Sequence, residues 1–462
     1  MLMTPKQTIL SLLLCLLVQA CSLIKADVPL DKVAGRQIFQ NPDSAIAAVT
    51  GIYEGISSTS NFFSAGASVY GGLYADELVY TGLTVPITEF SNSTLNSGNT
   101  TLETIFWRNT YYFIYRTNAC IEGLAASESL DAGLRNQLTG EAKFFRAFLY
   151  FYLMQFFGEV PLVTSTDQLI IETMPRIPLA VIKESIFTDL RDAKALLKEN
   201  YPTSDRARAN KWSAAALLAR MYLYEQNWPM ALQEATQIIS SGTYRLVGPD
   251  SVFLLTSKEA ILQIQPVIQR YNTMDGFLFI PSAGIRPSFA ITTSLMSAFE
   301  PGDLRQTNWV ASQNNNGITY NYPFKYRKRL DASADFKVTE YTNLLRLAEI
   351  YLIRAECNTV QGLLPAAIRD IDIIRRRAGL PLIGETQPNM NATDLMALIR
   401  HERRIEFFAE SGHRWMDLKR AGNADGLMQS LKPGWKSTGL LWPIPANQIV
   451  LNPSLVQNPG YR

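Results

Sequence analysis

The spacing of hydrophobic residues predicts helices along most of this chain. Helical periodicity begins near Ser44, where Ala45, Val49 and Ile52 share one face, and we expect Asp43 or Ser44 to cap this helix. Two longer helical patterns follow, "TLETIFWRNTYYFIYRTNACIEGL" and "LRNQLTGEAKFFRAFLYFYLMQFFG". The second half of the latter is apolar nearly all round, so this helix is predicted to be buried inside a larger helical body.

Two stretches further along the chain repeat the pattern of one helix pair. In "WSAAALLARMYLYEQNWPMALQEATQII", Ala219, Tyr222 and Ala231 fall at the offsets of a tetratricopeptide pair, in which small residues allow two antiparallel helices to approach closely. In "YLIRAECNTVQGLLPAAIRDIDIIRRRAG", Ala355 and Ala367 repeat the spacing of Ala219 and Ala231. Each pair needs a neighbour to bury its apolar face, so repeated pairs predict a helical-repeat core.

Two weaker pairs extend this pattern. One joins the helix around Phe144 to a helix over residues 182–199, and the other joins "DLMALIRHERRIEFFAESG" to the segment that follows it. Residues 61–99 and 244–339 lack helical periodicity and are rich in aromatic and turn-forming residues, and the C-terminal "GLLWPIPANQIVLNPSLVQNPGYR" is interrupted by prolines. The expected fold is mostly α, with tetratricopeptide-type helix pairs as a scaffold, a long loop-rich and partly β insertion, and an extended tail.

The N-terminus carries an apolar run that ends at a cysteine, "LLLCLLVQACSLIK". The run over residues 9–18 is too short for a membrane span, which needs about 20 apolar residues. Its flanks are typical of a secretory signal peptide, and "VQAC" resembles a bacterial lipobox, although Gln19 departs from the usual small or β-branched residue. We therefore expect cleavage after Ala20 and a lipid anchor on Cys21; the alternative is an ordinary signal peptide followed by a chance cysteine.

The charge balance argues against some classes of binding partner, and the cysteine content argues against a disulfide-dependent fold. The 43 Lys and Arg residues nearly balance the 41 Asp and Glu residues, so no long-range field would recruit nucleic acid or an anionic surface. Of the four cysteines, Cys15 would be removed with the signal peptide and Cys21 would be acylated. The other two, Cys120 and Cys357, lie far apart in the sequence. We expect both to be buried helix thiols, with a disulfide between them as the alternative.

The sequence offers few residues for catalysis or metal binding. It has only two histidines, His401 and His413, and it lacks a glycine-rich phosphate loop and the common hydrolase motifs, so no cofactor or metal is expected. Asp76 and Glu77 are the strongest carboxylate pair for glycoside hydrolysis, but adjacent residues of an extended chain point apart. Asp303 next to Arg305 is more simply explained as a loop ion pair.

One stretch concentrates charge, "IRHERRIEFFAESGHRWMDLKRAG". Its carboxylates Glu402, Glu406 and Glu410 follow one helix face, with several arginines nearby. A solvated helix would show this pattern, and so would a half-buried ion network between helices. Because Phe407 and Phe408 lie in the same stretch, we favour the buried network and a structural role.

Several blocks of the chain resemble one known family. "GEAKFFRAFLYFYLMQFFGEVPLV", "LRLAEIYLIRAECN", "HERRIEFFAESGHRWMDLKR" and "LLWPIPANQIVLNPSLVQNPGY" look like the successive signature blocks of the SusD/RagB family of outer-membrane nutrient-binding lipoproteins. The lipobox cysteine and "NPDSAIAAVTGIYEGI" are similar to the start of that family. The chain departs from the family in its fairly short length and in lacking an acidic cluster just after Cys21.

The resemblance implies a non-enzymatic surface lipoprotein of the outer membrane. Family members resemble lids over a SusC-like TonB-dependent transporter and pass captured oligosaccharides, or in some members oligopeptides, into it. Under this hypothesis residues 1–20 are the signal peptide, residues 21–43 the lipidated N-terminus and tether, and residues 44–462 one SusD-like domain. The ligand loops would lie at about 61–100 and 244–339.

The chemistry of sugars selects the candidate binding residues. Sugars present flat C–H faces and hydroxyl groups, so a binding site needs aromatic rings together with amide, carboxylate or guanidinium partners. The candidates are Asp76, Tyr80, Phe90 and Asn92 in the first loop segment and Tyr271, Asn272, Trp309 and Tyr320 in the second. The alternative for each aromatic residue is core packing, which is also the interpretation of Trp107. Two other functions stay open at this point, a carbohydrate-active hydrolase and a structural adaptor that binds a protein partner through its repeats.

Overall fold

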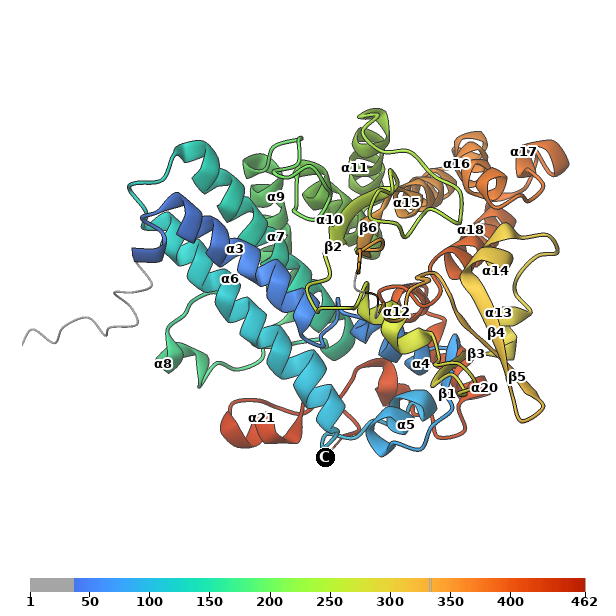
Figure 1. Ribbon diagram of the computed structural model, residues 1–462, viewed down its shortest axis with the longest axis horizontal. Helices are drawn as coiled ribbons and strands as arrows, with labels where there is room; N and C mark the ends of the chain where they lie inside the picture. Colours follow the sequence, from blue (N-terminus) through green and yellow to red (C-terminus); the bar gives the residue numbers. More distant parts are fainter. Residues whose placement is uncertain (1–36, 332, 334, 462) are drawn as a thin grey trace, which may run out of the picture.

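The computed structural model describes residues 37–331, 333 and 335–461 (Figure 1). The predicted signal peptide, the predicted lipidation at Cys21 and most of the predicted tether lie outside these residues. The described part begins just before helix α3 (Pro42–Ser58), whose N-cap is Asn41 and not Asp43 or Ser44. The Asn41 side chain accepts hydrogen bonds from the backbone N–H groups of both of those residues, so the helix begins slightly earlier than the apolar pattern indicates.

An array of antiparallel helices forms the scaffold and confirms the predicted mostly α fold. Neighbouring helices along the chain pack against each other from α6 onward, and Figure 1 shows them in one curved row. The row contains α6 (Asn109–Ala125), α7 (Ala132–Phe157), α9 (Leu179–Leu196), α10 (Lys211–Tyr224), α11 (Trp228–Ser240), α15 (Leu347–Val360), α16 (Leu364–Arg377) and α18 (Ala392–Glu406). The apolar end of α7 is buried between neighbours, as its sequence predicts.

The two clear repeats have matching internal geometry. Ala219 and Ala231 are fully buried where α10 meets α11, and Ala355 and Ala367 are fully buried where α15 meets α16. The turn between the two helices also lies at the same distance along the sequence from the first alanine in both pairs. In each turn one residue has a positive φ, Gln226 at 55° and Gly362 at 75°, and a proline follows in the first turn of the second helix. The predicted tetratricopeptide spacing is therefore confirmed in both pairs.

The segment over residues 61–99 is more ordered than its composition predicts. It contains η2 (Ala67–Gly71), α4 (Gly72–Tyr74), β1 (Leu78–Tyr80) and α5 (Val85–Asn92), and η3 (Leu102–Arg108) then leads into α6. Its glycines serve close packing, because a Cβ atom on Gly71 would lie 2.9 Å from the Cα atom of Gly412. The prediction of one long loop is wrong for this reason: small residues here allow the backbone to enter the core.

The later insertion contains the short strands predicted for residues 244–339, together with short helices that the sequence does not predict. Antiparallel pairs join β1 to β3 (Phe289–Ile291), β2 (Ala260–Ile264) to β6 (Thr342–Arg346), and β4 (Val310–Asn315) to β5 (Ile318–Pro323). The short helices are α12 (Met274–Phe279), α13 (Thr293–Met296) and α14 (Leu304–Trp309). The β1–β3 pair joins the early segment to the insertion, across more than two hundred residues of sequence.

The remaining helices are short. They are α8 (Gln168–Ile171), α17 (Ile383–Thr386), α19 (His413–Arg420), α20 (Ala424–Leu431), η4 (Ser437–Leu440) and α21 (Ala446–Leu451). The C-terminal segment therefore contains a helix where the sequence predicts an extended tail. Cys120 and Cys357 are buried free thiols, and Trp107 is a core residue, as expected. Within the described ranges no helix has both the length and the apolar character that a membrane crossing requires.

A buried ion network joins the insertion to α18, and it confirms the structural interpretation of the charged stretch. Glu406 accepts from Arg346 at 2.5 Å and also pairs with Arg305 and Arg377, and its own exposure is 0%. Further pairs connect Arg305 to Glu402 and Asp303, Lys325 and Arg346 to Glu410, and Arg375 to Glu402 and Glu300. The Asp303–Arg305 pair is thus one edge of a larger network and not an isolated loop contact.

We predict that Glu406→Gln destabilises the fold strongly. The variant leaves three buried guanidinium groups without their shared carboxylate, and removing one partner of a buried ion pair costs about 3–5 kcal/mol. Urea denaturation measures this change. The matched control is Glu184→Gln, which removes an exposed ion pair with Arg191 and should alter the free energy of unfolding by less than about 1 kcal/mol. Equal effects of the two variants would contradict the assigned role of the network.

A second stability prediction concerns the buried pair between α10 and α15. Burial opposes ionisation of Glu349, but the charge of Arg220, 2.7 Å away, outweighs it and lowers the carboxyl pKa from 4.5 to about 2. Because the folded-state pKa is depressed, this stabilisation is complete above about pH 4.5 and is lost as the pH falls toward 2. The difference in unfolding free energy between the wild type and Glu349→Gln should therefore shrink over this range. The control is Glu199→Gln, which removes an exposed pair with Lys211 and should alter the free energy of unfolding by less than about 1 kcal/mol.

Candidate functional site

A cavity of about 500 Å³ opens where the early segment meets the insertion. We call it the β1–α5 cavity. It is lined by Asp76, Leu78, Val79, Ser91, Asn92, Thr94, Thr292, Ser294, Leu431, Lys432, Pro433 and Gly434. In Figure 1, β1, β3, α5 and α20 come together at the lower right, far along the chain from one another but adjacent in space.

Backbone hydrogen bonds between distant segments form the walls of this cavity. Strand β1 pairs with β3 in the register Val79 to Ala290, and the hydroxyl of Thr292 donates to the Asp76 carbonyl at 2.6 Å. Helix α5 ends at Ser93, whose φ of 55° turns the chain back. The ammonium group of Lys432 donates to the carbonyls of Leu73 and Ser91, which ties the loop after α20 to α4 and to the end of α5.

The charged side chains that line the cavity already have ion-pair or hydrogen-bond partners in the protein. Asp76 accepts from Arg414 at 2.7 Å and from Arg404 at 2.7 Å. Burial opposes ionisation of Asp76, but the hydrogen bond and charge of Arg414, with the charge of Arg404, hold its pKa below the usual value. Burial lowers the pKa of Lys432 to about 8. Asp76 therefore belongs to a fixed ion cluster and is not a free acid or base.

The neighbouring carboxyl group behaves differently. Glu77 is buried, and burial together with the charge of Asp76 raises its pKa to about 8. One of its oxygens accepts from the backbone N–H of Ala409 at 3.2 Å. Asp76 and Glu77 thus bind different partners, and the geometry does not support them as the carboxylate pair of a glycosidase.

The cavity surface combines small apolar and neutral polar groups. Leu78, Val79, Leu431 and Pro433 supply apolar area, while the serine and threonine hydroxyls and the Asn92 amide supply hydrogen-bond donors and acceptors. Val79 and Leu431 are each 43% exposed. Such a surface fits a ligand with both C–H faces and hydroxyl groups. Among the described residues that line it, none is aromatic.

The candidates from the early segment divide between the cavity and the core. Asp76 and Asn92 both line the cavity, and Asn92 is exposed. Tyr80 is half-buried on β1, beside the cavity. Its hydroxyl donates to Thr84, and its ring lies against Phe289. Phe90 corrects the prediction: its exposure is 0%, because the inner face of α5 packs it among aromatic core residues that include Trp442.

The candidates from the insertion do not come together. Tyr320 is half-buried on β5, which lies beside β3 and therefore near the cavity region. Trp309 corrects the prediction, because it is fully buried and its indole N–H donates to the Pro249 carbonyl. Tyr271 and Asn272 lie elsewhere, at a small enclosed space between the end of α3 and the segment after β2.

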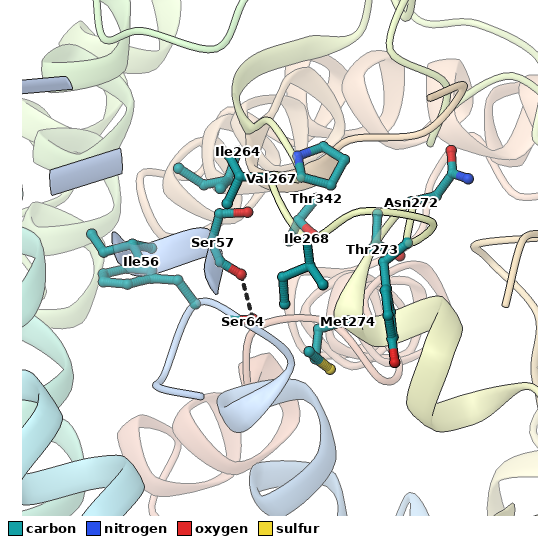
Figure 2. A pocket seen from close by; sticks show the side chains of 13 residues that line it. Ile56, Ser57, Ser64, Ile264, Val267, Ile268, Asn272, Thr273, Met274 and Thr342 are labelled. Carbon is teal, nitrogen blue, oxygen red and sulfur yellow. Dashed lines mark hydrogen bonds between the residues drawn. The ribbon is translucent and has the colours of Figure 1, made fainter. Parts of the chain in front are cut away.

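That small space cannot hold a sugar ring. Its volume is about 20 Å³, on a measure by which one water molecule needs about 10–15 Å³. Figure 2 shows Ile56 and Ser57 facing Ile264 and Ile268 across it. Asn272 is fully buried, and its carbonyl oxygen accepts from the backbone N–H groups of Thr339 and Glu340, so its role here is structural.

Sequence reasoning missed several residues that line the β1–α5 cavity. Thr94, Ser294 and Lys432 carry its polar groups, and Leu431 carries exposed apolar area. Thr94 lies two residues from the candidate Asn92, in the same loop segment. The "LKPG" turn after α20 gives a local turn signal, but nothing in the sequence indicates that it meets β1. In the described part of the chain no group of three or more His, Cys, Asp or Glu residues is arranged to hold a metal ion.

Comparison with known proteins identifies the class. Residues 292–440 match the profile described as the SusD family, and residues 81–223 match the profile described as starch-binding associating with outer membrane. The two ranges together span more than half of the chain. Two SusD-like proteins from Formosa agariphila are similar to it over nearly their whole length, one 23% identical (96% of this chain and 97% of the relative) and the other 25% identical (99% and 100%). The chain belongs to the SusD-like family.

Solved structures agree with this assignment at the level of the fold. A SusD superfamily protein from Bacteroides vulgatus superposes with a TM-score of 0.79 at 22% identity and covers 91% of this chain and 99% of its own. A laminarin-binding SusD-like protein gives a TM-score of 0.77 at 23% identity, with the same coverage. The surface glycan-binding protein A from Bacteroides fluxus gives 0.73 at 21% identity, again covering 91% and 99%.

Proposed function

We propose that this protein binds glycan fragments without cleaving them and that the β1–α5 cavity is the binding site. The observation that carries the proposal is the cavity of about 500 Å³ formed by the two segments in which the sequence places ligand loops, together with residues 431–434. Two relatives in fold are named for binding laminarin and surface glycan, which supports a glycan as the ligand class. Asp76 is already paired with two arginines and Glu77 is buried, so neither carboxyl group is free to act in hydrolysis. This favours a binding function.

The proposal includes a cellular setting. Signal peptide cleavage and acylation of Cys21 would anchor the protein at the outer membrane, exposed on the cell surface, and residues 22–43 would serve as a tether. The matched family description of outer-membrane association supports this location. A SusC-like TonB-dependent transporter would be the partner that receives the ligand, with the helical scaffold as its contact surface.

We predict that binding depends on Asn92. A panel of glycan fragments and oligopeptides, tested by isothermal titration calorimetry against protein that starts after Cys21, identifies the ligand. Asn92→Ala should then weaken binding about two- to tenfold, because one hydrogen bond contributes about 0.5–1.5 kcal/mol. Asn389→Ala removes an exposed amide that lines a separate surface depression and should leave the affinity unchanged. Hydrolysis of any panel member, or binding of oligopeptides alone, would contradict the proposal.

We also predict that Cys21→Ala releases the protein from membranes. Mass spectrometry of the wild-type N-terminus should find acyl chains on Cys21, and membrane fractions should contain the protein. The variant should lose both the acyl mass and the membrane association, since the anchor depends on this sulfur. Cys120→Ala, which alters a buried thiol of α6, is the control and should stay acylated. An unmodified Cys21 in the wild type would exclude lipid anchoring at this residue.

A further inference from the structure

A second cavity adjoins the Asp76 ion cluster. It has a volume of about 240 Å³ and is lined by Arg400, Arg404, Arg414, Asp417, Leu418, Arg420, Ala421, Asn423 and Leu427. We call it the arginine cavity. Asp76 lines the β1–α5 cavity, and the two arginines that bind Asp76 line this one. The two cavities therefore share one wall.

Helix geometry explains why arginines gather here. Arg400 and Arg404 are four residues apart on α18 and so lie on one face of that helix. Arg414, Asp417 and Leu418 are spaced by three and four residues on α19 and form one face of it in the same way. The tight connection between the two helices, with Gly412 at a φ of 70°, brings these faces together around one cavity.

The charges around the arginine cavity do not balance. Arg404 and Arg414 share the single carboxylate of Asp76. Arg420 pairs with Glu356 and with Asp417, and Asp417 is also bound by Arg403.

Arg400 is exposed and makes no ion pair with any residue that the structure describes. The four arginines that line the cavity thus have three carboxylate partners, Asp76, Glu356 and Asp417, and Asp417 is shared with Arg403.

The Arg404 guanidinium shows the effect of this imbalance. Burial lowers its pKa, the charge of Asp76 opposes that change, and the charge of Arg414 lowers it further. Its Nε atom is buried without an acceptor among the described residues. A planar guanidinium group binds carboxylate and sulfate oxygens through paired hydrogen bonds, so an oxyanion in this cavity would supply the missing negative charge and acceptors.

We propose that the arginine cavity binds an acidic substituent of the glycan, a carboxylate or a sulfate ester, while neutral sugar units occupy the adjacent β1–α5 cavity. This inference rests on the proposed function, and it specifies the ligand class as an acidic polysaccharide fragment. The shared wall places the two subsites next to each other, so a single oligosaccharide contacts both. The Asp76 ion cluster lies between them and holds two of the arginines in position.

The test compares ligands that differ only in their acidic groups. Full-length protein, purified from membranes in detergent, is titrated with oligogalacturonate and its methyl ester, and with a sulfated galactan oligosaccharide and its desulfated form. We expect about tenfold or greater preference for at least one acidic member over its neutral counterpart, and a preference that falls between 20 and 300 mM NaCl, as charge screening requires. The two pairs distinguish carboxylate from sulfate.

A pair of matched variants locates the effect. Arg400→Gln removes the unpaired cation and should weaken binding of the preferred acidic ligand about three- to tenfold, a larger loss than for its neutral counterpart. Arg376→Gln, at an exposed arginine near the end of α16, is the control and should show no such loss.

Equal affinity for acidic and neutral members of both pairs, or equal effects of the two variants, would overturn the inference and leave the proposed glycan binding intact. Failure to bind any member of a broad glycan panel would overturn both.

Discussion

The buried carboxylate of Glu406 is the interaction on which the arrangement of this protein depends. A carboxylate with no exposed surface is stable only when cations and hydrogen bonds replace its lost hydration. Glu406 finds these partners in Arg305, Arg346 and Arg377, which come from the insertion, from β6 and from α16. One charged group on α18 therefore fixes the relative positions of the strand insertion and the last helices of the scaffold.

The position of α18 then determines the region around the β1–α5 cavity. Because α18 is held against the insertion, Arg404 lies within reach of Asp76, and the turn into α19 brings Arg414 to the same carboxylate. Asp76 precedes β1, and β1 forms its ladder with β3 of the insertion. A chain of ion pairs and strand contacts thus runs from the helical scaffold to the walls of the β1–α5 cavity.

The scaffold could be predicted from the sequence because its signals are local. Apolar spacing, paired alanines and a proline in the first helical turn recur within each pair, and the structure places Ala219, Ala231, Ala355 and Ala367 in the expected contacts. The buried carboxylates of α18 were also predictable, because aromatic neighbours accompany them in the sequence. The ends of helices were less predictable from the sequence. Asn41, which caps α3, precedes the first residue of the apolar pattern.

The cavity could be predicted only in part, because its walls come from distant segments. Asp76 and Asn92 were identified from the chemistry of a single loop segment, whereas Ser294 and Lys432 join them through contacts that no local pattern encodes. Phe90 and Asn92 are two residues apart, yet the first is in the core and the second faces solvent. Composition alone could not distinguish the buried residue from the exposed one. The difference depends on the two faces of the short helix α5, and this helix was not predicted.

The three-residue ladder between β1 and β3 has a consequence for the order of folding. Its partners are separated by most of the scaffold, and Lys432 then closes the same region from near the C-terminus. Contacts between such distant segments carry a large loop-closure entropy and form after the local helix pairs. The local helix pairs can therefore stack first, while the β1–α5 cavity forms last, when nearly the whole polypeptide is in place.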